Sequence, residues 1–121
     1  MLWSFVALLA THWFADFVLQ THWQASNKSK NNVALSRHVL VYTSVLGAAS
    51  FALFALPGYG LQWLIFTLGN GALHFATDYG TSRWTSRLYA KQDWHNFFVV
   101  VGFDQLIHQT TLAVTMWYLF A

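Results

Sequence analysis

Apolar side chains dominate four long stretches of the chain, and shorter polar turns separate them. The stretches cover residues 2–23, 33–56, 61–88 and 97–120. A helix needs about 20 predominantly apolar residues to cross the hydrocarbon core of a bilayer. Each stretch is long enough, so the pattern predicts four transmembrane helices within a single integral-membrane domain, residues 1–121. The expected fold class is all-α, a polytopic membrane protein built as a four-transmembrane-helix bundle.

Composition agrees with a membrane protein. Of the 121 residues, 56% are hydrophobic, 19% are aromatic and only 8% are charged. A typical water-soluble domain has about 25% charged residues. The lipid bilayer is therefore the first expected partner, and the composition leaves open whether the chain forms an oligomer. Cysteine is absent, which excludes disulfides and thiolate metal sites.

The distribution of positive charge predicts how the helices are oriented. Lysine and arginine occur only around the first and third turns, whereas the second turn and both chain ends carry none. The six basic residues are Lys28, Lys30, Arg37, Arg83, Arg87 and Lys91. By the positive-inside rule their side is cytoplasmic, which leaves both termini outside. The orientation of the helices in the membrane explains where these six charges lie. They therefore give no reason to expect a nucleic-acid partner.

Candidate chemistry comes from aspartates inside the apolar stretches. Three of the four aspartates lie there, and each has a histidine four positions away. Residues at this spacing share one face of a helix. An aspartate at the centre of a bilayer costs about 3 kcal/mol on insertion scales, so each needs compensation. The three pairs are His12 with Asp16, His74 with Asp78, and His108 with Asp104.

The order within each pair follows the direction of its helix. The first and third helices run toward the basic side and have histidine before aspartate. The fourth helix runs the other way and has aspartate first. Each carboxylate is thus expected one helical turn nearer the basic side than its imidazole. His38, near the basic end of the second helix, adds a fourth imidazole, so the pattern predicts one shared polar site.

A divalent metal ion explains this site most simply. Zinc is the leading candidate because it accepts mixed imidazole and carboxylate ligands. Manganese and iron are the alternatives, and the site can hold one ion or two. A catalytic metal supplies activated water, which predicts hydrolysis with Asp16, Asp78 and Asp104 as candidate catalytic residues. Gln20, Asn70 and Gln105 are expected to orient the ligands. The predicted ligands are His12, Asp16, His38, His74, Asp78, Asp104 and His108.

Two other interpretations of these residues stay open. The pairs can be interhelical hydrogen bonds that serve only assembly, or they can form a proton or ion pathway. The basic residues also have two interpretations. Lys28, Arg83 and Arg87 can hold a phosphate-bearing lipid or small-molecule substrate at the cytoplasmic mouth of the site. Alternatively they only fix topology and contact anionic lipid head groups.

The motifs together resemble the domain-of-unknown-function 3307 family, which comprises small multipass membrane proteins of bacteria and phages. They are His12-x-x-x-Asp16-Phe17-x-x-Gln20, Asn27-Lys28, His38, His74-x-x-x-Asp78-Tyr79, Ser82-Arg83-x-x-Ser86-Arg87 and Asp104-Gln105-x-x-His108. Their pattern is similar to that of a broader group, the inner-membrane metal-dependent hydrolases. The resemblance implies a multipass protein of the bacterial inner membrane that hydrolyses a phosphoester with a metal. The alternative is a non-enzymatic membrane protein, either an ion conduit or a phage-encoded factor that modifies its host's envelope.

Overall fold

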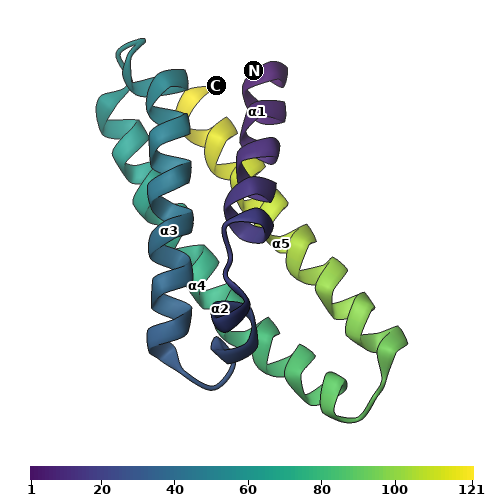
Figure 1. Ribbon diagram of the computed structural model, residues 1–121. Helices are drawn as coiled ribbons and strands as arrows, with labels where there is room; N and C mark the ends of the chain where they lie inside the picture. The colour runs from purple at the N-terminus through teal and green to yellow at the C-terminus, as the bar shows by residue number, and fades with distance from the viewer.

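The computed structural model describes residues 1–121, and all of its regular elements are helices (Figure 1). The all-α class is therefore confirmed. Two of the elements are π-helical turns, η1 and η2, which directly continue the helices before them. In chain order the elements are α1 (Leu2–Trp13), η1 (Phe14–Val18), α2 (His22–Asn27), α3 (Asn32–Ser50), η2 (Phe51–Ala55), α4 (Gly60–Ala90) and α5 (Trp94–Phe120).

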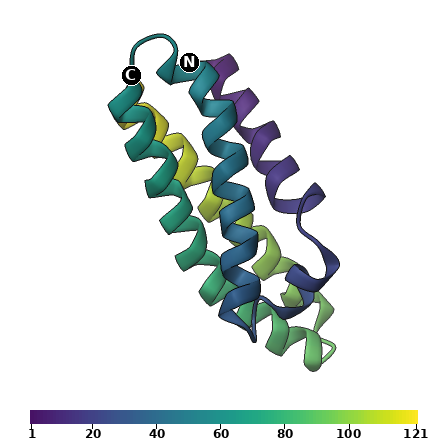
Figure 2. The same ribbon diagram turned by 60° about the vertical axis from the view of Figure 1, so that its left-hand side comes forward.

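The long helices run alternately up and down. Helix α1 packs on α3, α3 on α4, α4 on α5, and α5 back on α1, which closes a four-helix bundle. Both termini and the turn after η2 lie at one end of the molecule (Figures 1 and 2). The turns after α2 and after α4 lie at the opposite end. The three lysines lie in these turns, and the three arginines lie in the parts of α3 and α4 that lead to them, so the basic residues gather at one end, called the basic end below.

The first predicted helix is interrupted, which corrects the single helix expected over residues 2–23. Regular helix ends at η1, and the chain is irregular at residues 19–21 before α2 begins. A capping box at Thr21 gives the local reason. The Thr21 hydroxyl accepts a hydrogen bond from the Gln24 backbone N–H, and the Gln24 side chain accepts one from the Thr21 N–H. These two bonds stabilise a new helix start, so α2 runs separately and lies against α3.

The distribution of side chains is inverted relative to a water-soluble protein. Exposed large hydrophobic side chains outnumber buried ones, and Trp3 and Tyr118 are 81% and 80% exposed. The interior, in contrast, contains four histidines and two aspartates. An apolar cluster that includes Leu8, Leu46 and Leu112 fills the half of the bundle nearest the termini. The buried histidines and aspartates lie nearer the basic end, while Ser50, Thr67 and Asn70 are the polar side chains buried toward the termini.

Two helical segments are long and apolar enough to cross a membrane. They are Asn32–Ala55, which joins α3 and η2, and Trp94–Phe120, which is α5. Helix α4 has 31 residues, but it contains Asn70, His74 and Asp78. These polar side chains face the interior of the bundle and are buried there. The mean hydropathy of α4 is therefore lowered in part by polar residues that face the interior of the bundle.

A close approach between α3 and α4 predicts different effects of two neighbouring glycines. A Cβ atom at Gly71 would lie 2.5 Å from Thr43 Oγ1, whereas one at Gly69 would meet nothing within 4 Å. Gly71→Ala should lower the free energy of unfolding by about 1–3 kcal/mol through overpacking. Gly69→Ala should raise it slightly, because alanine favours the helix by about 0.5–1 kcal/mol. Thermal and denaturant unfolding in detergent measures both, and equal stabilities of the two variants would contradict this packing.

Candidate metal centre

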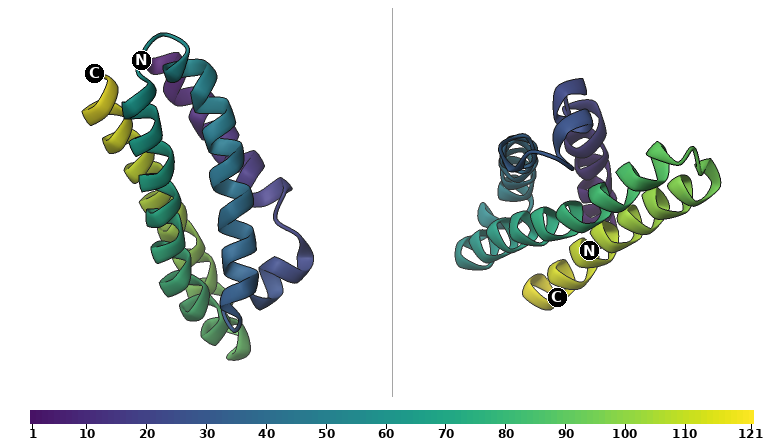
Figure 3. Two further views of the ribbon diagram at one scale, coloured as in Figure 1. Left: turned by 90° about the vertical axis from the view of Figure 1, so that its left-hand side faces the viewer. Right: turned by 90° about the horizontal axis from the view of Figure 1, so that it is seen from below.

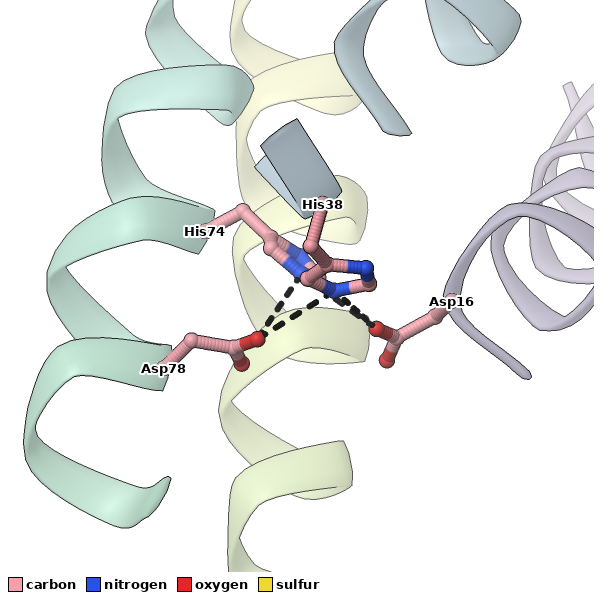
Figure 4. Close-up of side chains that lie close together, drawn as sticks. All are labelled: Asp16, His38, His74 and Asp78. Carbon is pink, nitrogen blue, oxygen red and sulfur yellow. Dashed lines mark hydrogen bonds and ion pairs between the residues drawn. The ribbon is translucent and has the colours of Figure 1, made fainter. Parts of the chain in front are cut away.

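Four buried side chains from three segments converge in the polar half of the bundle (Figure 4). Asp16 comes from η1, His38 from α3, and His74 and Asp78 from α4. His38 Nε2 lies 3.0 Å from Asp16 Oδ1, 3.3 Å from Asp78 Oδ2 and 3.2 Å from His74 Nε2. His74 Nε2 lies 3.3 Å from Asp16 Oδ1 and 3.4 Å from Asp78 Oδ2. These four residues are called the four-donor group.

The separations within the four-donor group fit tetrahedral coordination. Zinc bonds to imidazole nitrogen and carboxylate oxygen at about 2.0–2.1 Å, which places any two tetrahedral ligand atoms about 3.3–3.4 Å apart. The separations given above run from 3.0 to 3.4 Å. Five of the six pairs of donor atoms therefore have about the spacing that a tetrahedral divalent ion would need. This cluster can hold a metal ion, as the sequence predicted.

A second group of donors adjoins the first. Asp16, Asp104 and His108 also present ligand atoms within 4.8 Å of one another. His108 Nε2 lies 3.3 Å from Asp104 Oδ2 and 3.0 Å from Asp78 Oδ1. We call these three residues the three-donor group. Asp16 belongs to both groups, so its carboxylate links them.

His12 lies outside both donor groups, although the sequence offered it as a ligand. Its Nε2–H donates to Gln105 Oε1 at 2.9 Å, and its Nδ1 accepts from the Tyr42 hydroxyl at 2.9 Å. Asp16 Oδ2 is 3.6 Å from His12 Nε2. Because both ring nitrogens are occupied by hydrogen bonds, His12 acts here as a support for Gln105 and not as a donor to the site.

Gln105 connects the carboxylates, in agreement with its predicted orienting role. Its Nε2 donates to Asp16 Oδ2 and to Asp104 Oδ2, each at 3.1 Å. The Gln105 amide therefore fixes the relative position of carboxylates from η1 and α5. These contacts complete a hydrogen-bonded chain from Tyr42 through His12 to the three-donor group.

The other two predicted orienting residues form no direct hydrogen bond with the carboxylates, although Gln20 lines the same cavity as Asp16 and Asp104. Asn70 donates to Phe66 O and to Thr115 Oγ1, each at 2.9 Å, so it ties α4 to α5 and does not reach the carboxylates through a direct hydrogen bond. Gln20 lies in the irregular segment before α2, and its Oε1 is buried without a hydrogen-bond partner.

Two supporting residues were missed by sequence reasoning. The Tyr42 ring stacks on His74 with 3.8 Å between ring centroids, in addition to its bond to His12. The Thr81 hydroxyl donates to Asp104 Oδ1. Helical spacing could have signalled both, because Tyr42 lies four residues after His38 and Thr81 lies three after Asp78.

Lys28 reaches from the end of α2 to the four-donor group. Its Nζ lies 3.0 Å from Asp78 Oδ2. One ammonium beside three carboxylates leaves two negative charges in the polar interior when the imidazoles are neutral. Uncompensated charge is strongly unfavourable in such surroundings. Either a divalent cation or two protonated imidazoles would balance the site.

A cavity of about 620 Å³ opens beside the three-donor group. Asp16, Asp104 and Gln105 form its inner wall, and Lys28 and Lys30 lie on another side. The cavity thus gives access from the basic end to the carboxylates.

Arg83 and Arg87, which the sequence offered for substrate binding, are not among the residues that line this cavity. The Arg83 guanidinium lies 3.5 Å from the Tyr79 ring centroid, and its Nη1 donates to Tyr79 O. Among the predicted substrate-binding residues, Lys28 is the one that the fold places at the cavity.

The fold and the site define an all-α protein whose helices enclose a candidate metal centre. A family model described as "Protein of unknown function (DUF3307)" matches residues 4–121, so the chain belongs to that family. No curated protein and no solved structure matches the chain. The family confirms the resemblance seen in the motifs, and the activity has to be argued from the site.

The contact between Lys28 and Asp78 gives a test of the site's charge balance. Lys28→Met should lower the free energy of unfolding by about 2 kcal/mol, less than for a fully buried pair because Lys28 is partly exposed. Lys30→Met is the matched control, since Lys30 is exposed and forms no ion pair. Denaturant unfolding of the two variants in one detergent gives the comparison, and a Lys28 variant as stable as the control would refute the role.

Proposed function

We propose that this protein is a membrane-embedded, metal-dependent hydrolase that acts on a phosphoester, with its His/Asp site facing the cytoplasm. The observation that carries the proposal is the four-donor group of two imidazole nitrogens and two carboxylate oxygens, in which five of the six separations are 3.0–3.4 Å, close to tetrahedral spacing. Zinc is the proposed ion, since this donor set suits it.

The membrane part of the proposal rests on the apolar outer surface. We propose four spans, α1 with η1, α3 with η2, α4, and α5, in the inner membrane of a bacterium. Exposed Trp3 and Trp117 mark the end that carries the termini, and exposed Trp84 and Trp94 lie toward the basic end. Tryptophan concentrates at both membrane interfaces. The basic end then faces the cytoplasm by the positive-inside rule.

The two donor groups differ in ways that suggest different roles. The four-donor group supplies four protein ligands and is fully buried, as in closed structural sites. The three-donor group has three protein ligands and adjoins the cavity, as in catalytic sites that keep one position open. A divalent ion held there would supply activated water at neutral pH.

Asp104 would bind that ion through one carboxylate oxygen, and of the three carboxylates it is the best placed to accept a proton from the water through its other oxygen. Its side chain is 15% exposed and lines the cavity, whereas those of Asp16 and Asp78 are 5% and 1% exposed. Thr81 and Gln105 hold Asp104 in place through hydrogen bonds to its two oxygens. Asp16 and Asp78 then serve mainly as metal ligands, and Lys28 offers an ammonium to a phosphate group in the cavity.

A proton or ion conduit is the second candidate, and the interior supports it less well. The hydrogen-bonded chain from Asp104 through Gln105 and His12 ends at Tyr42. Beyond it toward the termini, Leu8, Leu46 and Leu112 are fully buried and apolar. A pathway across the bundle would need a connected chain of polar groups in that half, and the buried Ser50, Thr67 and Asn70 there form no hydrogen bond with Tyr42 or with one another.

Metal content tests the centre itself. Protein purified in detergent should contain one or two equivalents of a divalent transition metal, and His74→Ala should lose at least one equivalent because it removes a ligand of the four-donor group. His95→Ala is the matched control, since His95 is exposed near the start of α5. Elemental mass spectrometry with thermal unfolding, before and after metal addition, gives the answer. Wild-type protein that binds no metal and gains no stability from it would refute the centre.

Hydrolysis tests the role of Asp104. The metal-loaded protein should hydrolyse phosphoesters such as p-nitrophenyl phosphate or an alkyl phosphate, and Asp104→Asn should slow this by about 100-fold or more through loss of the base. Asp93→Asn, in the turn before α5, should leave the rate unchanged. Equal rates for Asp104→Asn and wild type would exclude Asp104 as the base, and an inactive metal-loaded wild type would exclude the hydrolase proposal.

A further inference from the structure

The residues that line the cavity beside the three-donor group fall into two chemical sets, called its polar wall and its apolar wall below. The polar wall consists of Lys28, Lys30 and the serines and threonines of α2, the following turn and α4. The apolar wall consists of Phe17 from η1 and Phe97 and Val101 from α5. Because different helices supply the two sets, a ligand with a polar and an apolar part suits the cavity.

Ser82 gives independent evidence for a ligand at the polar wall. It is only 7% exposed, and its buried Oγ has no hydrogen-bond partner although it lines the cavity. Leaving a buried hydroxyl unpaired costs about 1–3 kcal/mol, so such groups in folded proteins usually have a partner. A ligand oxygen would accept from Ser82.

The positive charge of the polar wall indicates which chemical group supplies the ligand oxygen. Lys28 and Lys30 both line the cavity, and the carboxylates that also line it, Asp16 and Asp104, belong to the donor groups, where a cation or protonated imidazoles would balance them. An ammonium and a hydroxyl donor together suit a phosphate group. Lys28 also contacts Asp78, so a phosphate beside Lys28 lies next to the donor groups.

The apolar wall continues onto the outer surface of the bundle. Phe17 is 47% exposed, and its neighbour Val18 is 50% exposed on the same turn η1. On α5, Phe98 is 66% exposed beside Phe97. Near the basic end, α2 lies against α3, while α5 pairs with α4 (Figures 1 and 3). Since Phe17 both lines the cavity and is exposed, a route from the cavity to the outer surface would run beside η1, facing α5.

We propose that the cavity binds an amphiphile with a phosphate head group, the phosphate at Lys28 and Ser82 and the hydrocarbon chain leaving past Phe17, Phe97 and Val101. A volume of about 620 Å³ suits the head group and the first carbons of a chain, and the remainder lies along the lipid-facing surface. This inference rests on the proposed membrane location and names the substrate class of the proposed hydrolase. It needs neither the metal nor turnover.

Binding measured by native mass spectrometry tests it, with the full chain in a neutral detergent, with and without added zinc. Three probes separate the sources of phosphate: phosphatidic acid, phosphatidylcholine, and the tail-free glycerol 3-phosphate. Phosphatidic acid should bind at least 10-fold more tightly than either of the others. Binding of glycerol 3-phosphate as tight as that of phosphatidic acid would show a pocket for soluble phosphoesters and overturn the amphiphile assignment.

Two pairs of variants locate the ligand. Ser82→Ala should weaken phosphatidic acid binding about 10-fold, whereas Ser44→Ala, on an exposed face of α3, should not. Phe97→Ser should weaken it several-fold without changing the binding of glycerol 3-phosphate, and Phe98→Ser is the control because Phe98 does not line the cavity. Wild-type affinity in both cavity variants would overturn the proposal.

The metal content of the same samples is measured as well. It distinguishes a failure of the proposed lipid binding from a failure of the proposed metal centre. A protein that holds metal but shows no preference for phosphatidic acid would lose this substrate assignment alone. A protein that prefers phosphatidic acid without holding metal would keep the binding site and lose the hydrolase.

Discussion

The structure depends on three carboxylates that meet in the interior of a bundle whose outer surface is apolar. Asp16, Asp78 and Asp104 come from η1, α4 and α5, and imidazoles from α3, α4 and α5 lie against them. Carboxylates in such surroundings are costly unless cations or hydrogen-bond donors compensate them. That requirement accounts for the Lys28 ammonium and the Thr81 hydroxyl, which each donate to one of the three, and for the Gln105 amide, which donates to two.

The interruption after the first helix follows from the same requirement. The π-helical turn η1 carries Asp16, and the irregular segment after it allows α2 to fold back against α3. Lys28, at the end of α2, can then reach Asp78 from outside the long helices. An unbroken helix over residues 2–23 would continue in the direction of α1, and the chain would not fold back against α3. π-helical turns are often found at functional sites, and here the turn supplies the donor that both groups share.

The bundle is also divided along its length. Apolar packing around Leu46, Phe66 and Leu112 fills the half near the termini, and the donor groups occupy the other half beside the cavity. The interior is thus accessible from the basic end and closed toward the opposite one. In the proposed membrane orientation, this asymmetry favours chemistry at one membrane surface over transport across the membrane. It also places the lysines, the hydroxyl groups and the carboxylates within one cavity.

The sequence by itself determined the all-α class, the gathering of basic charge at one end and the residues of both donor groups, because helical spacing and helix direction fix which side chains share a face and a depth. Only the tertiary structure decided their partners. His12 pairs with Tyr42 and Gln105 instead of joining the donors, Lys28 reaches the site, and Arg83 lies outside the cavity. These outcomes depend on contacts between residues far apart in the chain, such as Gln105 with Asp16, and on the break at residues 19–21. Spacing along one helix carries no information about which neighbouring helix will supply a partner.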